Sequence, residues 1–312
     1  MRVKRVRPDT IVRYADSVDD FLQWAQSKRL QVKSDRQADK AMARYFDQVF
    51  EDGCPLTVAS YTLFGYIVLR TIPDRAERDM FPLSRAALAA WRGSRAGGSR
   101  VGMVPQVIFH FAAFCIHNKA TDAAAAVLLQ YDLYTRPSEI LNLRGRDIIP
   151  SVHAFNSPWG ILLGNSEFEE QTKTGATDDV ILCDSSHRQW ANKLLRCIGK
   201  RVGQSDSPIF NISLSQYEKL FRDFSKLEGL KGGLFTPHVI RHSGPSYDLI
   251  NEYRTFESIQ ARGRWAAPSS VARYRKPGRL LMTAARLPAK FQRYTEQPLQ
   301  WALERLLIFP WA

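Results

Sequence analysis

The chain has 312 residues, of which 45% are hydrophobic and 24% charged, a composition typical of folded globular proteins that excludes a disordered chain. Its 44 Lys and Arg outweigh 31 Asp and Glu, so the formal net charge is +13 and a polyanionic partner is favoured. No apolar run approaches the ~18 residues of a membrane span, and the basic N-terminus lacks the apolar segment of a signal peptide. We therefore expect an intracellular protein, in the cytoplasm of a prokaryote or the nucleus of a eukaryote.

The cysteines are scattered along the chain and form neither a CxxC pair nor a cluster with histidines at zinc spacing. They are Cys54, Cys115, Cys183 and Cys197. We expect reduced thiols and no metal site, and nothing in the sequence predicts a cofactor.

Residues 15 to 92 carry apolar side chains at helical spacing, beginning with the stripe that contains Val18 and Phe21. Helix stops such as Asp52-Gly53 and Pro73-Asp74 separate the stripes. This pattern predicts a bundle of about four helices.

A change in composition follows. Residues 91 to 100 are rich in Gly, Ser and Arg, which is typical of a flexible basic linker. We therefore expect a helical domain at residues 1–98, a basic Gly/Ser linker at 99–105 and a second domain at 106–312.

The second domain begins with helical patterns that run through Tyr134, and Thr135 is placed to cap the helix that follows. Short β-rich runs at 148–149, 159–163 and 180–183 then predict a small antiparallel sheet. Helical patterns return at 187–202 and 214–227, and the chain ends in an amphipathic tail helix at 296–309. The predicted fold class is mainly α with a small antiparallel sheet (α+β). The apolar face of the tail fits either its own core or a neighbouring protomer.

Positive charge is concentrated between residues 253 and 293, where Glu257 is the one acid among ten Lys and Arg. These cations are interleaved with Trp265, Tyr274 and Phe291, which favours nucleic-acid binding over a merely solvated basic face. The side chains we expect to contact DNA are Arg262, Arg264, Arg273, Arg275, Lys276 and, in the linker, Arg100.

Six side chains have the chemistry that a phosphodiester requires: Arg136, Lys173, His238, Arg241, Trp265 and Tyr274. Arginines present fixed donor forks to the non-bridging oxygens and to the charge of a pentacovalent transition state. A tyrosine can attack phosphorus, a histidine can accept its proton, and a lysine can protonate the leaving alkoxide. An indole N–H only donates, so the tryptophan is suited to holding a phosphate oxygen. Together these groups predict a metal-free strand-transfer site.

The same residues resemble the motifs of the tyrosine recombinase (phage integrase) family. Arg136-Pro-Ser-Glu139 resembles its R-x-S-E motif, and His238-Val-Ile-Arg241-His242 resembles its H-x-x-R-H motif. Tyr274 stands at the place of the nucleophile, nine residues after Trp265, and Lys173 lies between the second and third predicted strands.

Two positions depart from the family pattern. The usual T-G-L before the first arginine is Leu133-Tyr134-Thr135, and the common L-G-H is Gly263-Arg264-Trp265. The tryptophan variant occurs in the family.

The resemblance implies a DNA recombinase or integrase that forms a 3′-phosphotyrosyl intermediate without metal or ATP. It assigns Arg136, Lys173, His238, Arg241, Trp265 and the nucleophile Tyr274 to catalysis, and Glu139 and His242 to support. It also implies that residues 1–98 form a core-binding domain on double-stranded DNA, and that four protomers surround two duplexes, for which the C-terminal tail is the candidate contact.

Three alternatives remain open. A type IB topoisomerase uses the same chemistry as a monomer. A domesticated DNA-binding protein of this fold would keep the DNA clamp and lose cleavage. A helical interaction module without DNA leaves the charge and the motif spacing unexplained.

Overall fold

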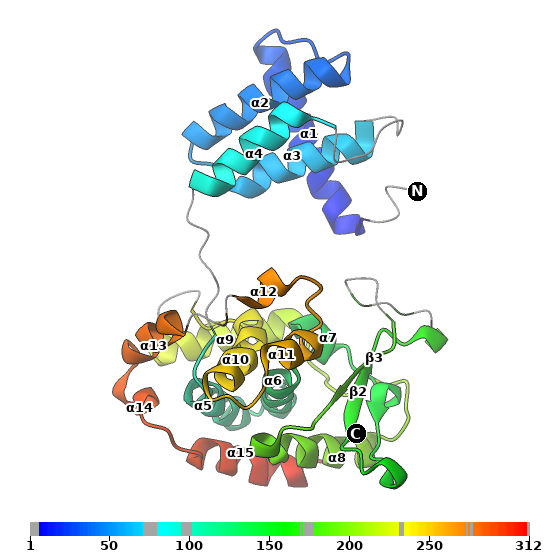
Figure 1. Ribbon diagram of the computed structural model, residues 1–312, viewed down its shortest axis with the longest axis vertical. Helices are drawn as coiled ribbons and strands as arrows, with labels where there is room; N and C mark the ends of the chain where they lie inside the picture. The colour runs from blue at the N-terminus through cyan, green and yellow to red at the C-terminus, as the bar shows by residue number, and fades with distance from the viewer. Residues whose placement is uncertain are drawn as a thin grey trace. The chain divides into compact units, whose positions relative to one another are not determined.

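The computed structural model describes residues 6–70, 80–94, 102–168, 170, 172, 177–230, 234–272, 274 and 277–310. The chain divides into two compact units, Met1–Gly98 and Ser99–Ala312, which are considered separately below (Figure 1). No helix in the described ranges is long and apolar enough to cross a membrane.

The regular elements described in the first unit are all helices. Its elements are α1 (Pro8–Ser27), α2 (Asp35–Glu51), α3 (Leu56–Arg70) and α4 (Pro82–Ser94). Their apolar stripes meet in one core whose largest members include Phe21, Phe46 and Trp91. Buried Asp39 in α2 accepts hydrogen bonds from the backbone N–H groups of Leu83 and Ser84, so it caps α4 from a neighbouring helix.

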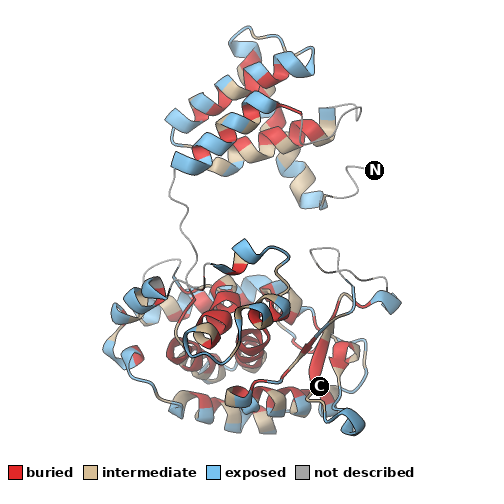
Figure 2. Cartoon of the chain, in the orientation of Figure 1, coloured by how far each residue is buried: buried red, intermediate tan, exposed pale blue. Residues whose placement is uncertain are grey.

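The second unit is built around α6 (Thr121–Leu133). Residues 123 to 133 are all buried, including the polar Gln130 and Asp132, so the helix has no solvent-facing side there, as Figure 2 shows in the centre of this unit. Around it lie α5 (Pro105–His117), α7 (Pro137–Leu141), α8 (Gln189–Val202), α9 (Leu214–Leu227), α10 (Pro237–Ile250), α11 (Phe256–Arg262), α12 (Pro268–Ala272), α13 (Gly278–Ala285), α14 (Ala289–Gln292) and α15 (Gln297–Ile308).

A small sheet covers one side of the second unit. Its strands are β1 (Ile148–Ile149), β2 (Gly160–Leu163) and β3 (Asp179–Leu182), and both pairings are antiparallel in the order β1-β2-β3. Ile161 on the central strand pairs with Ile148 on one side and Ile181 on the other, and all three are buried. The predicted fold class, mainly α with a small antiparallel sheet, is confirmed.

The predicted linker is wrong at its C-terminal end. Gly102 and Met103 are buried, and the Met103 N–H donates a 2.8 Å hydrogen bond to the Ser243 hydroxyl of α10. A Cβ on Gly102 would lie 2.7 Å from the His242 carbonyl oxygen, so glycine permits this close approach. These residues therefore belong to the core of the second unit, whereas residues 95–101 lie outside the described ranges.

The C-terminal helix docks on its own chain. α15 packs against α5 and α8, and Leu299, Ala302 and Leu306 enter the core of the second unit. The apolar face that was the candidate contact between protomers is therefore already covered. Phe309 also packs against this core, and Trp311 lies outside the described residues.

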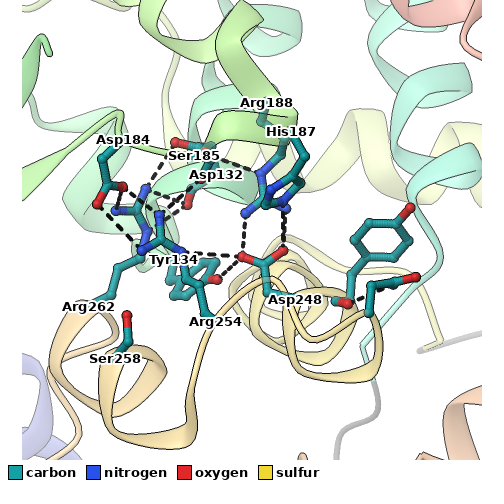
Figure 3. Close-up of polar contacts among 12 residues, drawn as sticks. Asp132, Tyr134, Asp184, Ser185, His187, Arg188, Asp248, Arg254, Ser258 and Arg262 are labelled. Atoms are coloured by element: carbon teal, nitrogen blue, oxygen red, sulfur yellow. Dashed lines mark hydrogen bonds and ion pairs between the residues drawn. The ribbon is translucent and has the colours of Figure 1, made fainter.

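A largely buried polar network joins the ends of several elements (Figure 3). Asp132 in α6 and Asp248 in α10 are fully buried, and Arg188 bridges them. Its Nε donates to Asp132 at 2.8 Å, and its two terminal nitrogens donate to the two oxygens of Asp248 at 2.7 and 2.6 Å. Arg262 at the end of α11 donates to Asp132 at 3.0 Å and to Asp184, just after β3, at 2.8 Å. We call these five residues the Asp132/Asp248 network.

The charge of Asp248 is strongly stabilised. Burial by itself would raise the pKa of Asp248, but hydrogen bonds from His187, Arg188 and Tyr134 and the charge of Arg188 outweigh burial and lower the pKa to about 2. That value is below the ~3.9 of a free aspartate. The contribution of Asp248 to the free energy of unfolding is therefore complete above pH ~4 and is lost as the pH falls towards about 2.

We predict that Asp248→Asn lowers the free energy of unfolding by about 3–5 kcal/mol at neutral pH, because Arg188 loses a buried counter-charge. The difference from wild type should narrow between pH 4 and 2, where the wild-type carboxylate becomes protonated. Urea unfolding at a series of pH values measures both effects. The control is Asp223→Asn, which breaks an exposed ion pair with Lys219 and should change stability by less than about 0.5 kcal/mol. A difference that stays constant down to pH 2 would contradict this account.

Candidate active site

The site begins at the first turn of α7, where the Glu139 side chain accepts a hydrogen bond from the backbone at the N-terminus of the helix. The Arg136 N–H donates to Glu139 Oε2 at 2.7 Å, and the Arg136 guanidinium forms an ion pair with Oε1. Pro137 occupies the first helical position, which requires no N–H donor. The N-cap is therefore Arg136 and not Thr135, so the predicted cap is one residue too early.

Two further guanidinium groups meet the same carboxylate. Arg264 Nη2 donates to Glu139 Oε2 at 2.6 Å, and Arg241 Nη1 donates to it at 3.4 Å. We call Arg136, Arg241, Arg264 and Glu139 the arginine cluster. Within this cluster, three positive charges against one negative charge leave two positive charges on side chains that are largely buried, and Asp179 lies 3.9 Å from Arg264 Nε at its edge.

Burial and charge shift the ionisation of this cluster in opposite directions. Burial would raise the pKa of Glu139, but Arg264, the N–H of Arg136 and the guanidinium groups of Arg241 and Arg136 lower it overall. Burial lowers the pKa of Arg241 to about 10, against the opposing effect of Glu139. At neutral pH Glu139 is therefore an anion and Arg241 a cation.

Tyr274 is held in a small apolar cluster beside these charges. Only 5% of it is exposed, and it packs with Tyr134, Ile259 and Val271. Its hydroxyl lies 2.5 Å from Nδ1 of His242 in α10. The imidazole is thus placed to exchange a proton with the phenol.

The loop after α11 connects this tyrosine to the arginine cluster. The Gly263 carbonyl accepts a 2.6 Å hydrogen bond from Arg241, whose guanidinium lies 5.0 Å from the centre of the Trp265 ring. The Trp265 ring is in turn 5.4 Å from the Tyr274 ring. A Cβ on Gly263 would lie 1.8 Å from the indole, so only glycine leaves room for the tryptophan.

Similarity to known proteins lies in the fold. No protein-family model matches the chain, and no curated protein matches its sequence. The chain is similar to the Tn1549 transposon integrase in complex with circular intermediate DNA, with 15% identity and a TM-score of 0.52 over 85% of this chain and 94% of that one. It is also similar to that integrase in complex with transposon right end DNA, with 14% identity and a TM-score of 0.53 over 96% and 94%.

The chain has the tyrosine recombinase fold. The resemblance expected from the sequence motifs is confirmed at this level, because identities this low establish the fold alone.

The two motif departures at Tyr134 and Arg264 share one backbone conformation. Tyr134 has a φ of 55° and Arg264 a φ of 53°, in the left-handed region that favours glycine. These are the two positions where the family motifs have their glycine. The side chains that replace glycine turn inward, Tyr134 to Asp248 and Arg264 to Glu139.

The structure brings together most of the predicted catalytic side chains. Arg136 and Arg241 meet at Glu139, and Trp265 and Tyr274 are in ring contact. His238 is half-buried, with its ring 6.1 Å from the His242 ring one helical turn away. The predicted catalytic Lys173 and the predicted DNA contacts Arg100, Arg273, Arg275 and Lys276 lie outside the described residues.

Of the other two predicted DNA contacts, Arg262 is buried and Arg264 is half-buried. Arg262 points into the protein, where all three of its guanidinium nitrogens are bonded within the Asp132/Asp248 network or to the backbone. This placement corrects the prediction for Arg262, because its donors are already used.

Sequence reasoning missed the contact between His242 and Tyr274 and the central place of Glu139. His238 and His242 are four residues apart and hence on one face of a helix, so the sequence did indicate two imidazoles facing one site. Nothing in the sequence indicated that one carboxylate holds three arginines, because the first and last of them, Arg136 and Arg264, are 128 positions apart.

We predict that Glu139→Gln lowers the free energy of unfolding by about 3–5 kcal/mol, because three guanidinium groups lose their shared counter-charge. Added sulfate should restore part of this loss, since an anion among the arginines replaces the carboxylate. Thermal unfolding with and without sulfate tests both statements. The control is Glu252→Gln, which removes an exposed acid. A sulfate effect equal in Glu139→Gln and in wild type would contradict the prediction.

Proposed function

We propose that the protein is a site-specific DNA recombinase or integrase that cuts and rejoins strands through a 3′-phosphotyrosyl intermediate. One observation carries the proposal: a tyrosine hydroxyl bonded to an imidazole lies next to a cluster of arginines with an excess of two positive charges. A nucleophile, a proton acceptor and oxyanion donors are the groups that phosphoryl transfer to an amino-acid side chain requires.

Two further observations support DNA as the substrate. The chain carries a net charge of +13, which suits the phosphate backbone. The integrase that it resembles in fold is in complex with DNA in both structures. Double-stranded DNA is therefore the proposed partner, with phosphate contacts supplying most of the affinity.

In the proposed reaction, the Tyr274 oxygen forms a bond to phosphorus while the bond from phosphorus to the 5′ oxygen breaks. The phenol proton passes to His242 or His238, and Lys173 gives a proton to the leaving 5′ oxygen. Arg136, Arg241 and the Trp265 N–H hold the non-bridging oxygens. The phosphotyrosyl bond conserves the energy of the phosphodiester, so a 5′ hydroxyl from a second duplex reverses the step without ATP.

The described state is not yet poised for attack. With 5% of Tyr274 exposed and its hydroxyl on His242, a duplex phosphate cannot reach the nucleophile. The proposal therefore includes a movement that brings Tyr274 out of its apolar cluster when DNA binds. A tetramer on two duplexes is part of the proposal, but its contacts use surfaces other than the apolar face of α15.

We predict that Tyr274→Phe keeps DNA affinity within about threefold and abolishes covalent adducts, because it removes only the nucleophilic oxygen. The protein is incubated with short fragments of the source organism's own DNA. SDS-resistant complexes are then isolated, and the attached ends are sequenced. A single recurring junction is expected for the wild type, and this junction supplies the cleavage substrate for later tests.

Tyr294→Phe is the control, since it removes the hydroxyl of an exposed tyrosine. SDS-resistant adducts that persist in Tyr274→Phe would refute Tyr274 as the nucleophile. DNA binding without adducts in the wild type would favour the inactive DNA-binding alternative. Relaxation of a plasmid that lacks the junction would favour the topoisomerase.

A further inference from the structure

The backbone conformation of Arg264 is sterically unfavourable. Its φ of 53° lies in the left-handed region, which a residue with a Cβ enters only against steric repulsion. Glycine would adopt the same conformation without this strain. A non-glycine residue persists in such a conformation when its surroundings require it, and such residues cluster at functional sites.

The side chain of Arg264 is also incompletely satisfied. Only 9% of it is exposed, and among the described residues it donates a single hydrogen bond, from Nη2 to Glu139. Its Nη1 and Nε are buried without a hydrogen-bond partner among those residues, and Nε lies 3.9 Å from Asp179 Oδ2. Buried donors without an acceptor are rare in folded proteins, and each requires an explanation. Here two of them lie on a single guanidinium that is already next to other cations.

The charge balance shows what Arg264 adds. Without it, Arg136 and Arg241 against Glu139 leave one positive charge, and Arg264 adds a second, which the more exposed Asp179, 3.9 Å from its Nε, offsets only in part. A phosphodiester carries one negative charge and gains a second as a deprotonated oxygen nucleophile adds to phosphorus. The cluster without Arg264 thus matches the substrate, whereas the complete cluster matches the transition state.

We infer that Arg264 is a further catalytic residue, whose free N–H groups hold a non-bridging oxygen of the scissile phosphate. The strain, the unpaired donors and the excess charge then have one cause, because all three make the site complementary to a bound oxyanion. Arg264 stays protonated throughout and takes no part in the proton transfers. This inference rests on the proposed function, since it assigns a role in the same reaction.

The Arg264→Gly variant distinguishes an effect of Arg264 on stability from an effect on the rate of adduct formation. Glycine relieves the left-handed backbone, so thermal stability should hold or rise, while the rate of adduct formation should fall by about 10²- to 10³-fold. Arg264→Lys keeps the charge but loses the donor fork, and its rate should lie between the two. The substrate is the duplex recovered from wild-type adducts. An adduct rate for Arg264→Gly within threefold of wild type overturns the inference.

Lys119→Gly is the matched control. Lys119 has a φ of 59° and is exposed in the turn between α5 and α6, so the substitution relieves the same strain and removes the same charge from a residue outside the arginine cluster. Its adduct rate should equal that of wild type.

A modified substrate distinguishes contact with the phosphate from a merely structural role. A methylphosphonate at the scissile position replaces one non-bridging oxygen with a methyl group. If Arg264 holds that oxygen, Arg264→Gly costs at least tenfold less on one methylphosphonate diastereomer than on the phosphodiester. Equal losses on the phosphodiester and on both diastereomers overturn the inference.

Orthovanadate binding tests the inference even if the proposed function is wrong. A wild type that forms no adduct with any fragment refutes the recombinase proposal, but oxyanion binding is still measurable by thermal unfolding in orthovanadate. A rise in melting temperature in wild type that is lost in Arg264→Gly supports the inference. An equal rise in both proteins, or none in wild type, overturns it.

Discussion

The carboxylate of Glu139 is the interaction on which the site depends. Two cations about 4 Å apart repel by roughly 4 kcal/mol at an effective dielectric constant near 20, so three converging arginines require a shared counter-charge. Glu139 supplies it from the first turn of α7 and thereby links Arg136, Arg241 of α10 and Arg264 of the loop after α11. Because it balances only one of three charges, the same residue that assembles the cluster leaves it attractive to a phosphate.

The Asp132/Asp248 network fixes the frame in which this cluster is assembled. Arg262 is bonded to the end of α6 and to Asp184 after β3, so the loop that follows it begins at a fixed point. The next residues then turn to the site, where the Gly263 carbonyl binds Arg241 and Trp265 packs on Tyr274. Neighbouring residues of one short segment thus divide into those that hold the fold and those that line the site.

Much of the fold and of the candidate site could be predicted from the sequence, because the sequence signals for them are local. Helical stripes and short β-rich runs indicated the mainly α fold with its small sheet, and the spacing of Arg136, Arg241 and Tyr274 indicated the family resemblance. The direction in which each side chain points was harder to predict. Arg262 and Arg264 belong to one basic run, and a run of cations does not say which side chain is bonded within the protein and which lines a site.

Other features depend on long-range packing and had no local signal. The face of α15 is apolar enough for its own core or for a neighbour, and only the position of α5 and α8 decides between them. Met103 follows a Gly/Ser-rich segment that is typical of a linker, yet the Ser243 hydroxyl binds its backbone.

The central claim is that Tyr274 forms a covalent bond to DNA, and identifying the attached residue tests it most directly. Wild-type adducts are digested with nuclease and protease, and the remaining nucleotide-bearing peptide is sequenced by mass spectrometry. This account predicts a nucleotide joined through its 3′ phosphate to the Tyr274 oxygen. A nucleotide on any other residue, or joined through its 5′ phosphate, would contradict it.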